Sequence, residues 1–321
     1  MDMSTENKTS ANLKPLHGQR IGLFGRGGSG KSTTTVFLAR ALAEAGYPVC
    51  VLDADSTNEG LAKALGADHA PDSLLEWLGG TVFSGGPVTC PVDDPVPLAG
   101  ARVNLRELPG RFFSHTPDGS LVFEAGKIGP LGPGAGCDGP MTKIARDFAL
   151  ETEGPRPVTL LDFKAGIEDA SRGVITSLDW VVGVIDPSYT GVQAAATMRT
   201  LLEQMHAGRM PATRHLQSPE LVKLTEDAYR AARTKGAVYV LNKVPDAETE
   251  HQLWQLLIQT GIQPVASIPD DSELRRAWLE GLPLASASAR AEAVKIVRAL
   301  EEGRGRFVDA NQGEPVATVK Q

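Results

Sequence analysis

Short apolar runs alternate with longer segments of helical periodicity along most of the chain. Strands buried on both faces are predicted by six of these runs, at residues 19–24, 49–53, 157–162, 180–186, 237–241 and 262–268. Helices are predicted by apolar spacing at residues 33–45, 59–65, 73–78, 191–206, 248–259, 272–280 and 289–302. Strands alternating with helices in this way predict an α/β fold, a doubly wound, mostly parallel sheet flanked by helices.

The domain organisation follows from where the alternation of predicted strands and helices begins, is interrupted and ends. We expect a single domain over residues 18–302, with a flexible tail at 1–17 and a polar, disordered tail at 303–321. Residues 68–136 are rich in Pro and Gly and form the least regular segment, with candidate strands at 103–108 and 121–124. Residues 207–234 are a helical insertion with a charged helix at 220–234. We interpret it as a solvated surface helix in preference to a partner-docking element.

Composition narrows the classes of function. The net charge of −7 and the lack of a basic block argue against a nucleic-acid partner. No apolar stretch reaches the length of a membrane span, and residues 1–16 lack the core of a signal peptide. Three cysteines in a chain of 321 residues do not suggest a disulfide framework, so we expect a cytoplasmic protein.

The segment Gly-Arg-Gly-Gly-Ser-Gly-Lys-Ser-Thr at residues 25–33 fits the pattern G-x-x-x-x-G-K-S/T between a predicted strand and a predicted helix. Such a loop curls its backbone N–H groups around phosphate, aided by the helix dipole. We expect Lys31 to contact the β- and γ-phosphates and Ser32 to complete a Mg²⁺ shell. The expected phosphate cradle is Gly27, Gly28, Ser29, Gly30, Lys31, Ser32 and Thr33.

A basic second residue, Arg26, followed by Gly27 and Gly28, makes this loop resemble the deviant phosphate loop K-G-G-x-G-K-S/T. That loop marks the deviant Walker A (SIMIBI) ATPase superfamily of division-site and partition ATPases (MinD and ParA types), nitrogenase iron protein and CooC-type nickel-insertion ATPases. The resemblance implies an ATP-promoted homodimer in which Arg26 reaches the partner's nucleotide. Arg26 replaces the family's lysine, keeping its charge with a different geometry. The alternative is a loop arginine in solvent.

Two acidic strand ends resemble the switch segments of this superfamily. In Asp53-Ala54-Asp55, the resemblance makes Asp55 the candidate that orients or deprotonates the attacking water; a helix N-cap is the alternative role. Residues 161–168, L-D-F-K-A-G-I-E, resemble switch II, which implies that Asp162 holds Mg²⁺ through water. The same resemblance implies that the Gly166 amide turns towards the γ-phosphate.

Two further segments resemble the superfamily's nucleobase site. Asn242 and Lys243 follow a predicted strand as in its base-contacting N-K motif, and Pro245 replaces the aspartate of the guanine-specific version. Pro269 and Asp271 lie in an I-P-x-D segment that resembles the one beside adenine. The resemblance therefore implies ATP, with Mg²⁺, as the bound nucleotide.

The segment around Cys137 resembles the G-x-G-C-x-C-P segment of the CooC type, in which two cysteines of each protomer build one metal site across the dimer. Here Gly139 replaces the second cysteine. A dimer then offers two Cys137 thiolates, which argues against an iron–sulfur cluster and is compatible with Ni²⁺ or Zn²⁺, with Asp138 as an additional ligand. The alternative is that metal binding has been lost. Cys50 is expected in the core, and Cys90 lies in a Pro-rich loop.

These features lead to three hypotheses of function. The first is a Mg²⁺-dependent ATPase, a dimeric switch that drives maturation of, or metal insertion into, a client metalloenzyme. The second is a MinD- or ParA-like positioning or partition ATPase. We expect no stable membrane anchor, because the apolar stripe of the last helix suits packing better than membrane binding. The third is an electron donor similar to nitrogenase iron protein, which requires a cluster.

Overall fold

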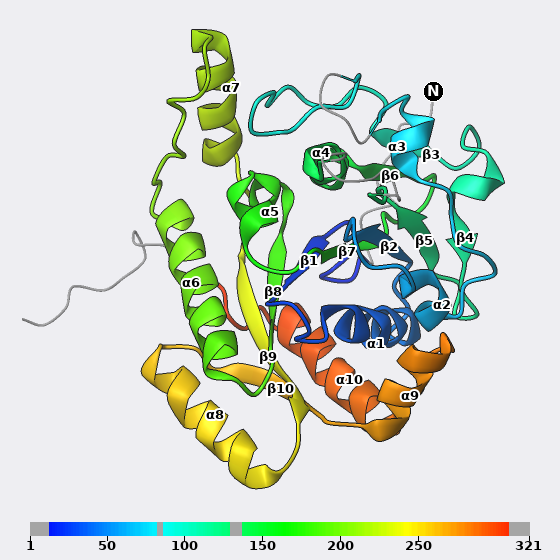
Figure 1. The fold of residues 1–321 in the computed structure, drawn as a ribbon, viewed down its shortest axis with the longest axis vertical. Helices are drawn as coiled ribbons and strands as arrows, with labels where there is room; N and C mark the ends of the chain where they lie inside the picture. The colour runs from blue at the N-terminus through cyan, green and yellow to red at the C-terminus, as the bar shows by residue number, and fades with distance from the viewer. Residues whose placement is uncertain (1–12, 82–85, 129–136, 308–321) are drawn as a thin grey trace, which may run out of the picture.

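The computed structural model describes residues 13–81, 86–128 and 137–307. In this part of the chain, eight strands form one sheet in the order β10-β9-β8-β1-β7-β2-β5-β4 (Figure 1). Neighbouring strands are parallel except at the edge, where β4 runs antiparallel to β5. The sheet strands are β1 (Arg20–Phe24), β2 (Val49–Ala54), β4 (Ser114–His115), β5 (Leu121–Glu124), β7 (Val158–Phe163), β8 (Trp180–Ile185), β9 (Gly236–Val244) and β10 (Pro264–Pro269). A separate parallel pair is β3 (Arg102–Asn104) with β6 (Ala149–Glu151).

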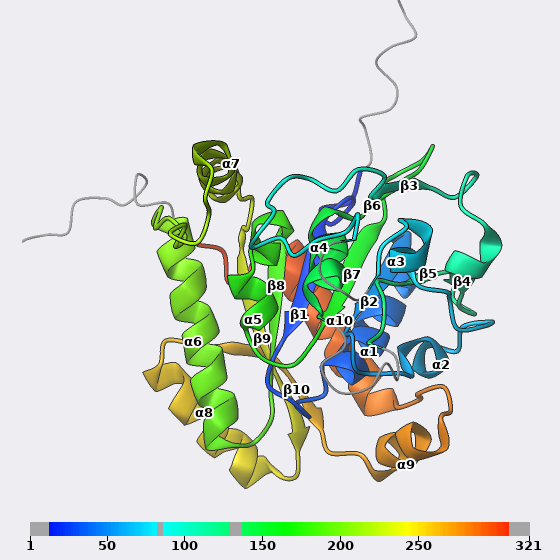
Figure 2. The ribbon, with the colours of Figure 1, turned by 45° about the horizontal axis from the view of Figure 1, so that its top comes forward.

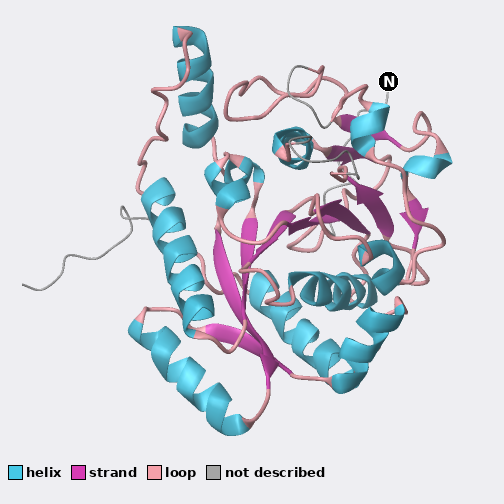
Figure 3. Ribbon diagram, viewed as in Figure 1, coloured by secondary structure: helices cyan, strands magenta, loops and turns pink. Residues whose placement is uncertain are grey.

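Helices cover both faces of the sheet (Figures 2 and 3). One layer contains α1 (Lys31–Glu44), α2 (Leu61–Leu65), α9 (Ser272–Glu280) and α10 (Ala287–Glu301). The other layer contains α3 (Leu74–Trp77), α4 (Gly139–Asp147), α5 (Glu168–Ser171), α6 (Tyr189–His206) and α8 (Ala247–Gln259). The remaining helix, α7 (Pro219–Arg230), has no buried residue and extends beyond α6 at the upper left of Figure 1. Within the described residues, no helix is both long and apolar enough to cross a bilayer.

The central strands are continuous apolar runs because their successive residues enter two different cores. In β2, Val49 and Val51 pack with α1 and α10, whereas Cys50 and Leu52 pack on the opposite face with α4. Cys50 is fully buried, as the sequence predicts, and burial raises the pKa of its thiol to about 12. This cysteine is therefore a core side chain.

The packed chain extends past the predicted domain limits of 18 and 302. Leu16, placed in the N-terminal tail by the sequence analysis, is only 1% exposed. After α10, the Gly305 carbonyl accepts from the Ala237 amide at 3.1 Å, and the Phe307 amide donates to the Lys235 carbonyl at 3.0 Å. The chain therefore returns to the start of β9 before the described residues end.

Several short elements, β4, β6 and α5 among them, were not predicted, and β3 and α4 differ from the prediction for reasons that the structure shows. The candidate strand at 103–108 is shorter, because β3 ends at Asn104 and its carbonyl accepts from the Glu107 and Leu108 amides in a turn. Helix α4 was not predicted, although its first seven residues are buried. It starts with Gly139 and Pro140, two residues that normally signal a loop, but Pro is favourable in the first turn of a helix.

Candidate nucleotide-binding site

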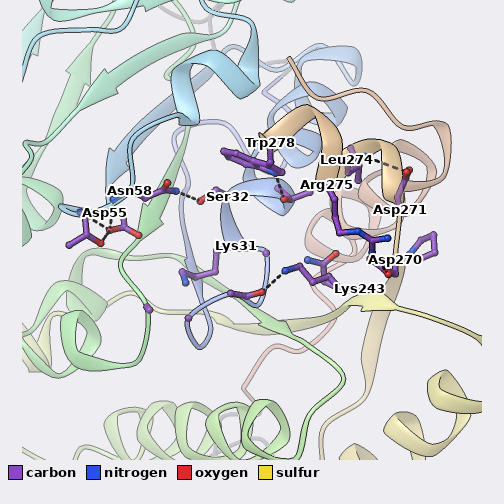
Figure 4. A pocket seen from close by; sticks show the side chains of 18 residues that line it. Lys31, Ser32, Asp55, Asn58, Lys243, Asp270, Asp271, Leu274, Arg275 and Trp278 are labelled. Carbon is purple, nitrogen blue, oxygen red and sulfur yellow. Dashed lines mark hydrogen bonds and ion pairs between the residues drawn. The ribbon is translucent and has the colours of Figure 1, made fainter. Parts of the chain in front are cut away.

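A cavity of about 540 Å³ opens at the carboxyl edge of the sheet, where the loops after β1, β2, β7 and β10 meet the end of β9 (Figure 4). Parallel α/β sheets bind ligands at this edge. Most of the predicted nucleotide residues line it: Gly27, Gly28, Gly30, Lys31, Ser32, Thr33, Asp55, Asn242, Lys243, Pro269 and Asp271. Arg26, Ser29, Gly166 and Asp162 do not line the cavity surface.

The phosphate loop is held in shape by a close fit between Gly30 and Asn242. Gly30 has φ +91° at the N-terminus of α1, and a Cβ there would lie 1.8 Å from Asn242 Nδ2. The same Nδ2 donates to the Ser29 carbonyl at 2.7 Å. Gly30 has no side chain to cap α1, so the first N–H groups of the helix are left for an anionic ligand.

Lys31 is oriented by the loop itself. Its Nζ donates to the Gly25 carbonyl at 3.2 Å and to the Arg26 carbonyl at 3.4 Å, and the residue is 7% exposed. Burial lowers the pKa of Lys31, and the nearby carboxylates of Asp162 and Asp55 partly offset this effect. The ammonium group thus sits in a desolvated position where phosphate would be a strong partner.

Asp162, at the end of β7, carries an unsatisfied buried oxygen. Its Oδ1 accepts from Thr35 Oγ1 at 3.2 Å, but Oδ2 has no hydrogen-bond partner among the described residues. Burial raises the pKa of Asp162 to about 6. A buried carboxylate oxygen without a partner is costly, and a hydrated cation would satisfy it. The Ser32 hydroxyl, which accepts from Asn58 Nδ2 at 3.1 Å, lies in the cavity wall. These oxygen donors fit Mg²⁺.

The loop after β2 fixes a second carboxylate at the cavity. Asp55 Oδ1 accepts from the Thr57 amide at 2.9 Å and from the Thr57 hydroxyl at 2.7 Å. Below it, Lys127 Nζ contacts Asp53 Oδ2 at 2.8 Å and the Asp55 carbonyl at 2.7 Å. Burial raises the pKa of Asp53 to about 7, although the Lys127 ammonium opposes the shift. Lys127 therefore braces this loop from the segment that follows the neighbouring strand β5, a role that the sequence analysis missed.

The opposite wall of the cavity is formed by β9 and α9. Lys243, at φ +59°, donates from Nζ to the Gly28 carbonyl at 2.8 Å. Asp271 caps α9 through the Glu273 amide at 2.9 Å, and its second oxygen accepts from Ser286 Oγ at 2.8 Å. Trp278 lines the cavity and donates from Nε1 to Thr33 Oγ1 at 2.9 Å. The sequence analysis did not identify Trp278, because it lies 245 residues from Thr33 in the chain.

Arg26 of the phosphate loop and Gly166 of the predicted switch II segment are engaged away from the cavity. Arg26 Nη1 forms an ion pair with Asp186 Oδ2 at 2.8 Å, and its side chain is 41% exposed. The Gly166 amide donates to the Gly25 carbonyl at 2.9 Å, and Gly166 has φ +99°. In this conformation the backbone of the predicted switch II segment is hydrogen-bonded to the phosphate loop.

Cys137 is exposed, and its Sγ accepts from the Gly139 amide at 3.4 Å. Asp138, expected as an additional metal ligand, is engaged elsewhere. Its Oδ2 lies 3.1 Å from Lys164 Nζ and its Oδ1 lies 2.6 Å from Arg172 Nη1. Burial tends to raise the pKa of Asp138, but Lys164 and Arg172 outweigh it and lower the pKa below its usual range. Both oxygens are thus committed to cations, and in the described residues no three His, Cys, Asp or Glu side chains form a metal-binding group.

The phosphate loop, the cavity and the parallel sheet together define a nucleotide-binding protein of the phosphate-loop class. Residues 24–284 match the CobQ/CobB/MinD/ParA nucleotide binding domain family, and the chain belongs to this family of ATPases. The superfamily and the fold class predicted from the sequence are confirmed.

Individual relatives are similar over most of their own length. An uncharacterized ATP-binding protein of Methanocaldococcus jannaschii is 28% identical over 264 residues, which are 82% of this chain and 92% of that protein. The carbon monoxide dehydrogenase accessory protein CooC of Rhodospirillum rubrum is 31% identical over 198 residues, 58% of this chain and 70% of that protein. The septum site-determining protein MinD of Pyrococcus horikoshii, solved with Mg-ADP, has a TM-score of 0.54 at 16% identity, covering 88% of this chain and 95% of that one. This last likeness concerns the fold.

Proposed function

We propose that this protein is a homodimeric, ATP-driven switch that hydrolyses ATP with Mg²⁺ to drive maturation of, or metal insertion into, a client metalloenzyme. The observation that carries the proposal is the pair of contacts from Asp138 to Lys164 and Arg172. These contacts join the segment after Asp162, at the nucleotide site, to the segment that bears the exposed Cys137. The 31% identity to a carbon monoxide dehydrogenase accessory protein supports the same role.

The proposed hydrolysis uses the residues gathered at the cavity. Lys31 binds the β- and γ-phosphates from its desolvated position, while Ser32 and Asp162 hold Mg²⁺. An ion held there would supply neutralisation of the phosphate charge. Asp55, with Oδ1 fixed by Thr57, orients the attacking water. Arg26 supplies a positive charge to the partner's nucleotide after leaving Asp186.

The proposed switch starts from the bond between the Gly166 amide and the Gly25 carbonyl. A γ-phosphate competes for this amide because it is a stronger acceptor than a neutral carbonyl. If Gly166 turns, Lys164 moves with it, since only one residue separates them. Asp138 and Cys137 then follow through the ion pair, so the thiol reports the nucleotide state.

The proposal specifies adenine over guanine. Lys243 is hydrogen-bonded to the phosphate loop, and Pro245 stands where an aspartate would read guanine. Trp278 and Pro269 supply apolar surface on the base side of the cavity, which suits a stacked purine.

The positioning-ATPase alternative gains no support from the last helix. Val297 and Leu300 of its apolar stripe are 4% and 1% exposed against α1, although Val294 is 41% exposed. Most of the stripe is thus used in packing. The electron-donor alternative requires a cluster, and anaerobically purified protein that is colourless would exclude it.

The proposal is tested by measuring ATP hydrolysis and molar mass on the same purified protein. Light scattering after size exclusion, with Mg-ATP, Mg-ADP or no nucleotide, should give a dimer in Mg-ATP alone. Lys31→Ala should lose both hydrolysis and the dimer, whereas Lys223→Ala, on the exposed helix α7 and outside the cavity lining, is the control that should keep both. A monomer in every state, or ATP-dependent pelleting with liposomes or DNA, would contradict the proposal.

A further inference from the structure

Cys90 lies directly against the backbone of Gly139. A Cβ built on Gly139 would be 2.8 Å from Cys90 Cβ and 3.1 Å from Cys90 Sγ. No side chain fits at position 139 while Cys90 keeps its place, since atoms of different residues do not approach so closely. The Cys90 sulfur therefore occupies the space that a second cysteine in a C-x-C segment would fill.

Cys137 also contacts this glycine, through the backbone amide. Its Sγ is 3.4 Å from the Gly139 amide nitrogen. Both sulfurs thus lie around one residue, although 46 residues separate Cys90 from Cys137 in the chain. Cys137 is exposed and Cys90 is half-buried, so a small ion can approach the pair from solvent.

The position of the Cys90 loop is fixed by a buried lysine. Lys143 of α4 is 2% exposed, and its Nζ contacts Asp94 Oδ2 at 2.6 Å and Thr89 Oγ1 at 3.0 Å. Loss of these partners would leave the buried ammonium group unpaired and would strongly destabilise the folded protein. Lys143 therefore clamps the loop that carries Cys90 onto the helix that begins at Gly139.

We propose that Cys90 and Cys137 of one chain jointly bind a soft divalent cation, such as Zn²⁺ or Ni²⁺, with Cys90 supplying the thiolate that position 139 lacks. Soft thiolates favour such ions. Two thiolates leave coordination positions open for water, for a second copy's pair or for an acceptor, as release of a cargo ion requires. This inference deepens the proposed function and rests on it for the purpose of the bound ion.

The test is an anaerobic titration of reduced, nucleotide-free protein with Cd²⁺, followed by thiolate-to-metal charge-transfer absorbance. Cys90→Ala and Cys137→Ala should each weaken binding by at least about tenfold, the loss that removing even an outer-shell partner of a metal causes. Cys50→Ala is the matched control, because Cys50 is fully buried, and should keep the wild-type band. Thermal melting of each variant checks that it folds.

An exchange of residues separates a ligand from a merely structural cysteine. The double variant Cys90→Gly with Gly139→Cys returns a thiol to the same space from the other backbone and should restore Cd²⁺ binding. The inference is wrong if wild-type protein shows no band, if Cys90→Ala binds Cd²⁺ as wild type does, or if the exchange fails to restore binding in a folded protein.

The two proposals fail separately. ATP-dependent dimerisation without a Cd²⁺ site would contradict the proposed Cys90–Cys137 site and leave the proposed ATP-driven switch standing. A Cys90- and Cys137-dependent Cd²⁺ site in a protein that neither hydrolyses ATP nor dimerises would do the reverse.

Discussion

Arg26 forms its ion pair with Asp186 of its own chain, with Nη1 2.8 Å from Oδ2. The same nitrogen lies 3.4 Å from the Ser188 hydroxyl. Both partners belong to the connection between β8 and α6, outside the nucleotide cavity. An arginine that is to reach the nucleotide of a partner must first leave this pair. The intramolecular contact would therefore compete with the proposed ATP-promoted dimerisation.

Asp186→Asn should favour the ATP-bound dimer, because it removes the charge that holds Arg26. A partly exposed ion pair contributes at most about 1 kcal/mol. Each of the two protomers releases one such pair, about 2 kcal/mol per dimer, so the dimer dissociation constant should fall by up to about thirtyfold. Sedimentation velocity across a protein concentration series in Mg-ATP measures this constant. Tighter self-association in the absence of nucleotide would instead point to a surface effect.

Arg26 variants provide the matching control. Arg26→Ala should bind nucleotide yet fail to form the ATP-promoted dimer, whereas Arg26→Lys keeps the charge and should retain it. If Arg26→Ala dimerises normally in Mg-ATP, the arginine has no role across the interface.

Gly30→Ala should abolish nucleotide binding through two separate effects. The left-handed backbone costs a residue with Cβ about 1–2 kcal/mol, and the new methyl group would collide with Asn242 Nδ2, 1.8 Å away. Gly28→Ala is the matched control, because Gly28 has φ +78° but open space around its Cβ position. Thermal melting and binding of a fluorescent ATP analogue should show a small loss for Gly28→Ala and a large one for Gly30→Ala. Equal losses would show that backbone strain dominates over the collision.

The stability of the nucleotide-free protein should depend on pH through the protonation of Asp162. Burial raises the pKa of Asp162 to about 6, above the ordinary 3.8. The native state therefore binds this proton more tightly than the unfolded state. The resulting stabilisation is fully present below about pH 4 and is lost as the pH rises through about 6. Asp162→Asn has no such proton, so its melting temperature relative to wild type should be higher at pH 8 than at pH 4.5.

The same variant links this proton to the proposed Mg²⁺ site. Asp162→Asn should require a higher Mg²⁺ concentration for half-maximal ATP hydrolysis, because an amide is a weaker ligand than a carboxylate. Unchanged Mg²⁺ dependence at pH 8 would remove Asp162 from the ion's ligands and leave its unsatisfied oxygen unexplained.

The part of the site that the sequence could predict is the part built from contiguous residues. The loop from Gly25 to Thr33 carries its own chemistry, and its flanking strand and helix are visible as patterns. Lys127, Asn58 and Trp278 escaped notice because no local pattern marks them. Sheet pairing brings the segment after β5 beside β2, and helix packing brings Trp278 to Thr33.

The segment after Cys137 shows a second limit of sequence reasoning. Asp138 looked available as a metal ligand because it adjoins a cysteine, but Lys164 and Arg172, 26 and 34 residues away, take both of its oxygens. Likewise, the sequence does not predict where Cys90 lies, because its loop is held against α4 by the contacts of Lys143 with Asp94 and Thr89. Long-range pairing of charges decides both cases.

Asp138→Asn should uncouple the nucleotide site from Cys137, because an amide cannot hold Lys164 and Arg172 as ion pairs. In wild-type protein, adding Mg-ATP should change the rate at which Cys137 is alkylated, measured by mass spectrometry of the peptide that carries it. The variant should lose most of this nucleotide dependence while still hydrolysing ATP, since Asp138 does not line the cavity. Glu151→Gln, on the distant strand β6, is a charge-matched control that should behave as wild type. An equal ATP effect in Asp138→Asn and wild type would mean that the nucleotide state reaches Cys137 by another route, or through the partner.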